Sequence, residues 1–252
     1  MATTSAAVHP DLVYDVGMHD GGDTAYYLSH GYRVVAIEAD PRLVEQASRR
    51  FADEVQSGRL TILNVGITTS SGAAIFWISP DKSVWNSFDR RIAARRSHAH
   101  HPITVPTCNF SEILMQYGVP YYLKIDIEGN DALCIEGLTG FPLPPFISVE
   151  TECLAEGEFL TEVGSRATLD LLHKRGYQRF KLIFQRDFSA VDSEAPEHRS
   201  KLEHSYRFRL GNSGPWGNQT PGRWLTYEEA KCEVALAANL QIESWHDWHA
   251  TF

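Results

Sequence analysis

One stretch near the N-terminus, residues 14–24, constrains the fold of this chain most strongly. It reads YDVGMHDGGDT, and it joins a hydrophobic segment to an expected short helix that ends at Gly31. Gly17 and Gly21 permit a tight turn and a close backbone approach to a ligand that a Cβ atom would block. A strand, a glycine turn and a helix N-terminus together are typical of nucleotide-binding α/β proteins.

A second signal comes at the end of the next expected strand, residues 33–38. Glu38 follows the turn by about 20 positions, where a carboxylate can accept hydrogen bonds from a ribose diol. Asp15 ends the first strand, and a carboxylate there disfavours a pyrophosphate but suits a cationic ligand. The turn also lacks the G-x-G-x-x-G spacing of dinucleotide-binding proteins. S-adenosylmethionine therefore fits this turn better than NAD, and an ordinary strand–turn–helix joint is the alternative.

The rest of the chain alternates strand and helix patterns, which predicts an α/β protein with a doubly wound, mostly parallel sheet. We expect a single domain over residues 1–252 with a flexible N-terminus at 1–10. Residues 187–224 are polar and rich in glycine, which is typical of a lid or a disordered loop. Further strands are expected at 60–65, 73–78, 121–129, 146–150 and 177–184, and helices at 41–57, 111–117, 130–139, 168–174 and 226–237.

Ionisable residues recur where the expected strands end. Lys124, Asp126 and Glu128 alternate with apolar residues, which predicts that they share one face of a strand. Charges are costly in a buried central strand unless they are paired or lie at its open end. A buried Lys124–Asp126 ion pair without chemistry is the alternative to a ligand site. Four strands have a carboxylate at or near their ends, and together these carboxylates favour a cationic ligand at that edge of the sheet. They are Asp15, Glu38, Asp126 and Glu150.

Composition excludes several classes of function. A net charge of −9 over 252 residues argues against a general electrostatic grip on nucleic acid. No apolar run approaches the length of a membrane span, and residues 1–10 do not resemble a secretory signal. The four cysteines are widely spaced without a C-x-x-C pair, so we expect reduced thiols in a cytoplasmic protein.

Two other segments have simple interpretations. The arginines and histidines of residues 90–101 match no metal-ligand spacing, so we expect a solvated surface there and no metal. Contact of these arginines with an acidic substrate is the alternative. Residues 245–249, with two tryptophans and two histidines, are expected to make a packing or oligomer contact, and a homo-oligomer is left open.

With these residues in view, the chain resembles the FkbM family of S-adenosylmethionine-dependent methyltransferases. The resemblance runs from about residue 11 to residue 150 and resumes in the glycine-rich segment. One departure concerns the first turn, where family members often carry asparagine in place of His19 or Asp20. The motifs are DVGMHDGGDT at 15–24, VAIEADP at 35–41, YLKIDIEG at 122–129 and ISVE at 147–150, and SGPWG at 213–217 is similar to a subgroup feature.

The resemblance implies a Rossmann-like class I methyltransferase fold with a seven-stranded sheet and a glycine-rich lid or insertion near the C-terminus. It also implies, most often, methylation of a hydroxyl oxygen on a small molecule such as a natural product or a sugar. Asp15 and Gly17 are then expected to hold the amino-acid half of the cofactor and Glu38 the ribose, with Asn64 and Val65 near the adenine. The matched motifs add Met18, His19, Gly21, Thr24 and Ala39 to the cofactor-binding set.

On the acceptor side we expect Asp126 and Glu128, with Lys124 tuning their charge. Asp126 is the first candidate for a general base or an acceptor orienter. A non-catalytic S-adenosylmethionine-binding module and an NAD-dependent oxidoreductase are the alternative functions. A divalent metal acting as Lewis acid is a lesser variant.

Overall fold

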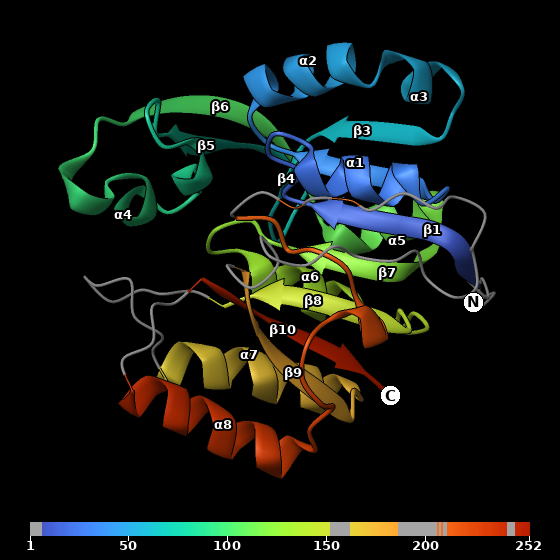
Figure 1. The fold of residues 1–252 in the computed structure, drawn as a ribbon. Coiled ribbons are helices and arrows are strands. Elements are labelled where there is room, and N and C mark those ends of the chain that lie inside the picture. Colours follow the sequence, from blue (N-terminus) through green and yellow to red (C-terminus); the bar gives the residue numbers. More distant parts are fainter. Residues whose placement is uncertain (1–6, 152–161, 186–205, 207, 209–210, 241–244) are drawn as a thin grey trace. The chain divides into compact units, whose positions relative to one another are not determined.

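A computed structural model describes residues 7–151, 162–185, 206, 208, 211–240 and 245–252, which are coloured in Figure 1. The chain divides into two compact units. Unit 1 consists of residues 1–28 and 32–145, and unit 2 of residues 29–31 and 146–252. Within the described ranges, no helix has the length and apolar character needed to cross a membrane.

A seven-stranded sheet has the hydrogen-bonded order β3-β2-β1-β7-β8-β10-β9. β1 is parallel to both β2 and β7, and β2 is parallel to β3. β10 is antiparallel to β8 and to β9. The predicted α/β class with a doubly wound, mostly parallel seven-stranded sheet is therefore confirmed. The strands are β1 Val8–Val16, β2 Arg33–Glu38, β3 Leu60–Asn64, β7 Val119–Ile125, β8 Phe146–Glu150, β9 Arg179–Phe184 and β10 His246–Thr251.

The helices begin where local sequence supplies a cap. Asp40 accepts a hydrogen bond from the Arg42 N–H at the start of α2, with Pro41 as its first residue. Thr226 and Glu229 form the predicted capping box at the start of α8. Unit 1 carries α1 Gly22–Ser29 (all but its last residue), α2 Pro41–Arg50, α3 Ala52–Gln56, α4 Arg90–Ala93, α5 Phe110–Tyr117 and α6 Asp131–Gly137, and unit 2 carries α7 Glu162–Arg175 and α8 Tyr227–Asn239.

Between β3 and α5 the chain forms a separate three-stranded sheet with the order β4-β6-β5. In Figure 1 this part of unit 1 lies on the side to which the arrowheads of β1 and β3 point, where those strands end. Its apolar side chains Phe76, Ile78 and Val105 pack on Ala39, which follows β2. Its elements are β4 Gly66–Ile67, β5 Gly72–Ile78, β6 His101–Cys108 and the 3-10 helices η1 Ser83–Trp85 and η2 Arg95–Ser97.

Several expected boundaries are wrong. Residues 8–10, which were expected within a flexible N-terminus, belong to β1, whereas residues 1–6 lie outside the described residues. Pro10 falls where the pairing with β7 is irregular and needs no donor. The surface loop expected at residues 98–101 ends earlier, because His101 begins β6 and pairs with Ile78. Residues 246–249 are part of β10, a strand paired on both sides, and Trp248 is fully buried.

The glycine-rich segment 187–224 lies partly outside the described residues. In its described part, the buried Lys181 of β9 donates hydrogen bonds from Nζ to the carbonyl oxygens of Gly217 (3.2 Å) and Thr220 (2.9 Å). Trp216 is buried as well. Residues 217–220 are thus attached to β9, and a lid role for the segment stays a prediction. Cys108, Cys134 and Cys232 are free thiols, and Cys153 lies outside the described residues.

Candidate functional site

The glycine turn after β1 packs directly on the backbone that follows β7. Gly17 has φ +85°, and a Cβ atom on it would lie 1.7 Å from the carbonyl oxygen of Asp126. Gly21 has φ +76°, and a Cβ atom there would lie 2.6 Å from the ring of Phe51. We expected these glycines to admit a ligand. In the structure, the missing Cβ atoms allow the turn to pack against the Asp126 backbone and the Phe51 ring.

A buried ion pair lies beneath this turn. The Asp15 carboxylate is fully buried; its Oδ2 accepts a hydrogen bond from Thr24 Oγ1 at 2.6 Å, and Lys124 Nζ lies 3.1 Å from its Oδ1. Lys124 Nζ also donates to the Gly17 carbonyl oxygen at 2.6 Å. Burial lowers the pKa of Lys124, but the carboxylates of Asp15 and Asp126 outweigh it, so this pKa lies above its usual range. Lys124 therefore binds the turn to β1 as a permanent cation.

Glu38 is held at the end of β2 by backbone donors. Its Oε2 accepts a hydrogen bond from the His19 N–H at 2.9 Å, and its Oε1 accepts one from the Asp40 N–H at 2.8 Å. Burial raises the pKa of Glu38 to about 7, although both N–H groups lower it. The Asp40 carboxylate adds to the increase, and Lys124 opposes it. Each carboxylate oxygen has lone pairs beyond its N–H contact, as acceptance from a diol requires.

The raised pKa of Glu38 predicts a pH-dependent stability. The folded-state value of about 7 exceeds the ordinary 4.5, so the folded protein binds this proton more tightly than the unfolded chain. The stabilisation is complete below pH 4.5 and is lost as the pH rises through 7; its size is about 3 kcal/mol. Urea unfolding of wild type and Glu38→Gln across pH 4–8 should show a wild-type advantage that declines with pH. A constant difference would contradict the assignment.

The remaining predicted cofactor residues join the ends of β1, β2 and β3. Asn64 Nδ2 donates to the carbonyl oxygens of Glu38 (3.0 Å) and Ala39 (3.2 Å), and the Val65 N–H donates to Glu38 O at 3.2 Å. Met18 is buried, and its N–H donates to the carbonyl oxygen of Ile37 in β2 at 3.0 Å. The predicted cofactor-binding set is thus brought together at one edge of unit 1.

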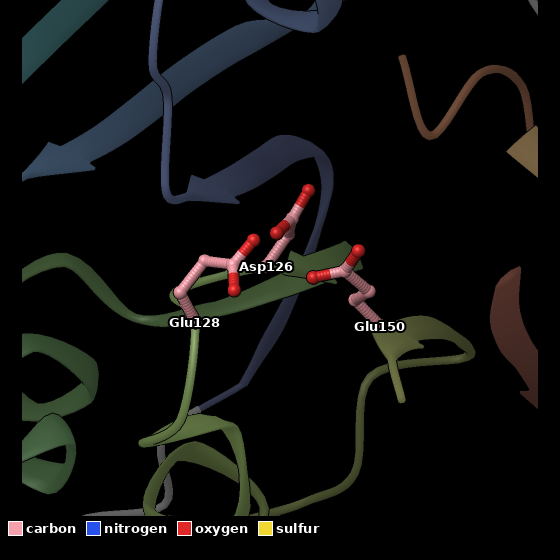
Figure 2. Close-up of side chains that lie close together, drawn as sticks. All are labelled: Asp126, Glu128 and Glu150. Atoms are coloured by element: carbon pink, nitrogen blue, oxygen red, sulfur yellow. The ribbon is translucent and has the colours of Figure 1, made fainter. Parts of the chain in front are cut away.

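The predicted acceptor residues lie in the turn after β7, since that strand ends at Ile125. Figure 2 shows the carboxylates of Asp126 and Glu128 rising from this turn, and it labels Glu150 at the end of β8. Asp126 Oδ2 lies 3.8 Å from Lys124 Nζ. The expected strand does not continue to Glu128, which has a left-handed backbone with φ +51°, but carboxylate oxygens of Asp126 and Glu128 still lie within 4.8 Å of each other.

The cation beside Glu128 is an arginine from the small-sheet region. Arg95 Nη1 lies 3.1 Å from Glu128 Oε2, and Ser87 Oγ donates to the Glu128 carbonyl oxygen at 2.6 Å. Asp131 holds the other side of the turn by accepting from the Ile127 and Gly129 N–H groups. The left-handed residue at 128 is therefore held by several contacts, as strained residues at functional sites usually are.

Sequence reasoning missed the contribution of residues 79–95 to the candidate site. Ser83, Asn86, Ser87 and Arg95 contact the loops at the ends of β1, β2 and β7. A local signal exists in the string WNSF at 85–88, in which two short polar residues stand between two aromatic ones.

Comparison with known proteins agrees with the motifs. The model of the methyltransferase FkbM domain matches residues 15–179. Among curated proteins, the probable ribosomal RNA small subunit methyltransferase A of Methanospirillum hungatei is 42% identical over 52 residues, which are 21% of this chain and 20% of that protein. The chain thus matches one fifth of the length of that relative.

The solved structures that match this chain have low sequence identity to it. The methyltransferase FkbM of Methylobacillus flagellatus KT is 16% identical with a TM-score of 0.45, over 71% of this chain and 41% of that one. The precorrin-6y C5,15-methyltransferase of Geobacter metallireducens is 10% identical with a TM-score of 0.43, over 98% of this chain and 82% of that one.

Proposed function

Because the chain belongs to the methyltransferase FkbM family, we propose that it transfers the methyl group of S-adenosylmethionine to a hydroxyl oxygen of a small molecule. The observation that supports this best is the packing of Gly17 on the backbone of Asp126. This contact holds the turn that we assign to the cofactor against the carboxylate that we assign to the acceptor. Much of the rate of methyl transfer comes from such positioning.

For the cofactor, we assign Glu38 to the ribose diol and Asn64 and Val65 to the adenine side. The donor set fits, since a buried carboxylate with two fixed N–H partners gains stability from further hydroxyl donors. Gly17 would face the amino-acid half. Asp15 would supply a negative charge from behind the turn, because its carboxylate is buried against Thr24 and Lys124.

The bound cofactor supplies an electrophilic methyl group, and the acceptor hydroxyl must lose its proton as it reacts. Asp126 is our candidate for the general base that accepts this proton, because its side chain is 21% exposed just after β7. Glu128 would orient the acceptor, with its charge balanced by Arg95 rather than by Lys124. Lys124 Nζ, 3.8 Å from Asp126 Oδ2, would place a positive charge beside that carboxylate.

Calorimetric titration tests the cofactor assignment. Wild type should bind S-adenosylmethionine and not NAD, and Glu38→Ala should weaken the binding. Failure to bind, or binding of NAD instead, would overturn the proposal. Transfer of a labelled methyl group to a panel of hydroxylated small molecules then separates an enzyme from a non-catalytic binding module. Loss of that transfer on chelation would reveal a metal acting as Lewis acid.

The role of Asp126 predicts a split between binding and turnover. In Asp126→Asn, the affinity for S-adenosylmethionine should stay within about twofold while turnover falls about 10²- to 10⁴-fold, the usual contribution of a general base. Asp53→Asn, on an exposed position of α3, is the matched control and should leave both unchanged. Normal turnover in Asp126→Asn would remove this residue from the mechanism.

We also propose that the protein acts in the cytoplasm as a single domain on a small-molecule acceptor. The net charge of −9 favours such an acceptor over nucleic acid. The substrate panel would identify the acceptor, and the mass of the protein in solution would give its oligomeric state.

A further inference from the structure

A closed ring of hydrogen bonds links the 3-10 helix η1 to the carboxylate that we assign to the ribose. The ring passes from Ser83 to His19, on to Glu38 and Asp40, and returns through Asn86. It lies wholly within unit 1. Neither the motifs nor the family match gives Ser83 or Asn86 a role.

The first half of the ring acts on the glycine turn. Ser83 Oγ and His19 Nε2 share a hydrogen bond of 2.8 Å, and the His19 N–H donates to Glu38 Oε2 at 2.9 Å. His19 has φ +50°, a conformation that a residue with a side chain adopts only when its surroundings hold it. The contact with Ser83 supplies that hold, so the direction of the His19 N–H depends on η1.

The second half acts through the residue that caps α2. The Asp40 N–H donates to Glu38 Oε1 at 2.8 Å, and Asn86 Nδ2 donates to Asp40 Oδ2 at 3.0 Å. The Ser79 N–H donates to Asn86 Oδ1 at 2.9 Å, which fixes the orientation of the amide. Asp40 and Asn86 are both buried, so water does not compete for these bonds.

The ring closes within η1 itself. The Asn86 N–H donates to the Ser83 carbonyl oxygen at 3.1 Å, so the two side chains are presented by one rigid turn. Their neighbour Val84 is 44% exposed and takes no part in these hydrogen bonds. A single 3-10 turn therefore controls both N–H groups that orient the Glu38 carboxylate.

We propose that Ser83 and Asn86 are positioning residues for the cofactor, which fix Glu38 in the orientation that accepts the ribose hydroxyls. This inference rests on the proposed function. If either link is lost, one N–H can leave Glu38, and the carboxylate no longer presents its remaining lone pairs in a single direction. The loss then falls on the ribose contact and on no other part of the cofactor.

The test measures binding of S-adenosylhomocysteine by calorimetry, which needs no acceptor. Ser83→Ala and Asn86→Ala should each weaken binding by about 5- to 20-fold, the effect of one lost hydrogen bond at a carboxylate. Val84→Ala, in the same turn, is the matched control and should stay within about twofold. The near-isosteric pair Ser83→Thr and Ser83→Val separates the hydroxyl from packing, and only the threonine variant should retain affinity.

An analogue without the ribose hydroxyls, 2′,3′-dideoxy-S-adenosylhomocysteine, separates a positioning role from a merely structural one. If Ser83 acts through the ribose contact, wild type and Ser83→Val should bind this analogue with equal affinity. An equal loss for both ligands would show that η1 only supports the fold and would overturn the inference. Unchanged affinity in both the alanine and valine variants would overturn it as well. Failure of wild type to bind S-adenosylhomocysteine would instead reject the proposed function, so the two failures are distinguishable.

Discussion

Gly17→Ala should lower the free energy of unfolding by about 4 kcal/mol or more, a loss reserved for severe steric or charge defects. A Cβ atom at this position would lie 1.7 Å from the carbonyl oxygen of Asp126, which is backbone and cannot rotate away. The positive φ of +85° adds strain of about 1–2 kcal/mol. Urea unfolding followed by circular dichroism measures the effect.

Gly58→Ala is the matched control for this prediction. Gly58 also has a positive φ, +74°, but a Cβ atom on it would meet nothing within 4 Å. It should therefore cost only the backbone strain, about 1–2 kcal/mol. Equal losses in the two variants would show that the contact between the β1 turn and the end of β7 is looser than the structure indicates.

Lys124→Met should be nearly as damaging, with an expected loss of about 3–5 kcal/mol. The change leaves the fully buried Asp15 carboxylate without the ammonium that lies 3.1 Å from it. It also removes the donor to the Gly17 carbonyl oxygen. The double variant Asp15→Asn with Lys124→Met should regain part of the stability, since no charge then stays buried alone. Strictly additive losses would contradict a coupled pair.

Lys181→Met is the control that separates the loss of an ion pair from the loss of any buried lysine. Lys181 is also buried, but its Nζ contacts are neutral oxygens of Gly217 and Thr220. Its removal leaves no stranded charge, so the loss should be about 1–3 kcal/mol. A loss as large as that of Lys124→Met would show that the Asp15 contact has no special weight.

Local patterns predicted three strands of the sheet well. Hydrophobic runs bounded by glycine and by caps located β2, β3 and β8 within one residue, because each is a short buried strand with a clear stop. The acidic strand ends at Asp15 and Glu38 were also located correctly. Asp15, however, proved to be buried against Lys124, a pairing across strands that spacing along the chain does not report.

The features that the sequence did not predict share one physical cause: they depend on contacts between residues far apart in the chain. Residues 245–249 were predicted as a packing or oligomer contact but not as part of a strand, because His246, Asp247 and His249 are polar residues that are nevertheless buried, Asp247 with Gln185 as a hydrogen-bond partner. Alternation predicted a continued strand at Glu128, but Asp131 and Ser87 bend the backbone there into the left-handed region. The contacts of residues 79–95 with the strand ends are equally invisible in any local pattern.

The position of β10 also bears on the order in which this protein can be completed during its synthesis. β8 and β9 are both translated before β10, yet β10 separates them in the sheet and pairs with each. One edge of β8 and one edge of β9 therefore wait for a partner that leaves the ribosome only after residue 251 has been added. Such waiting edges are templates for pairing with other chains. A nascent sheet of this topology relies on prompt arrival of β10 to avoid aggregation.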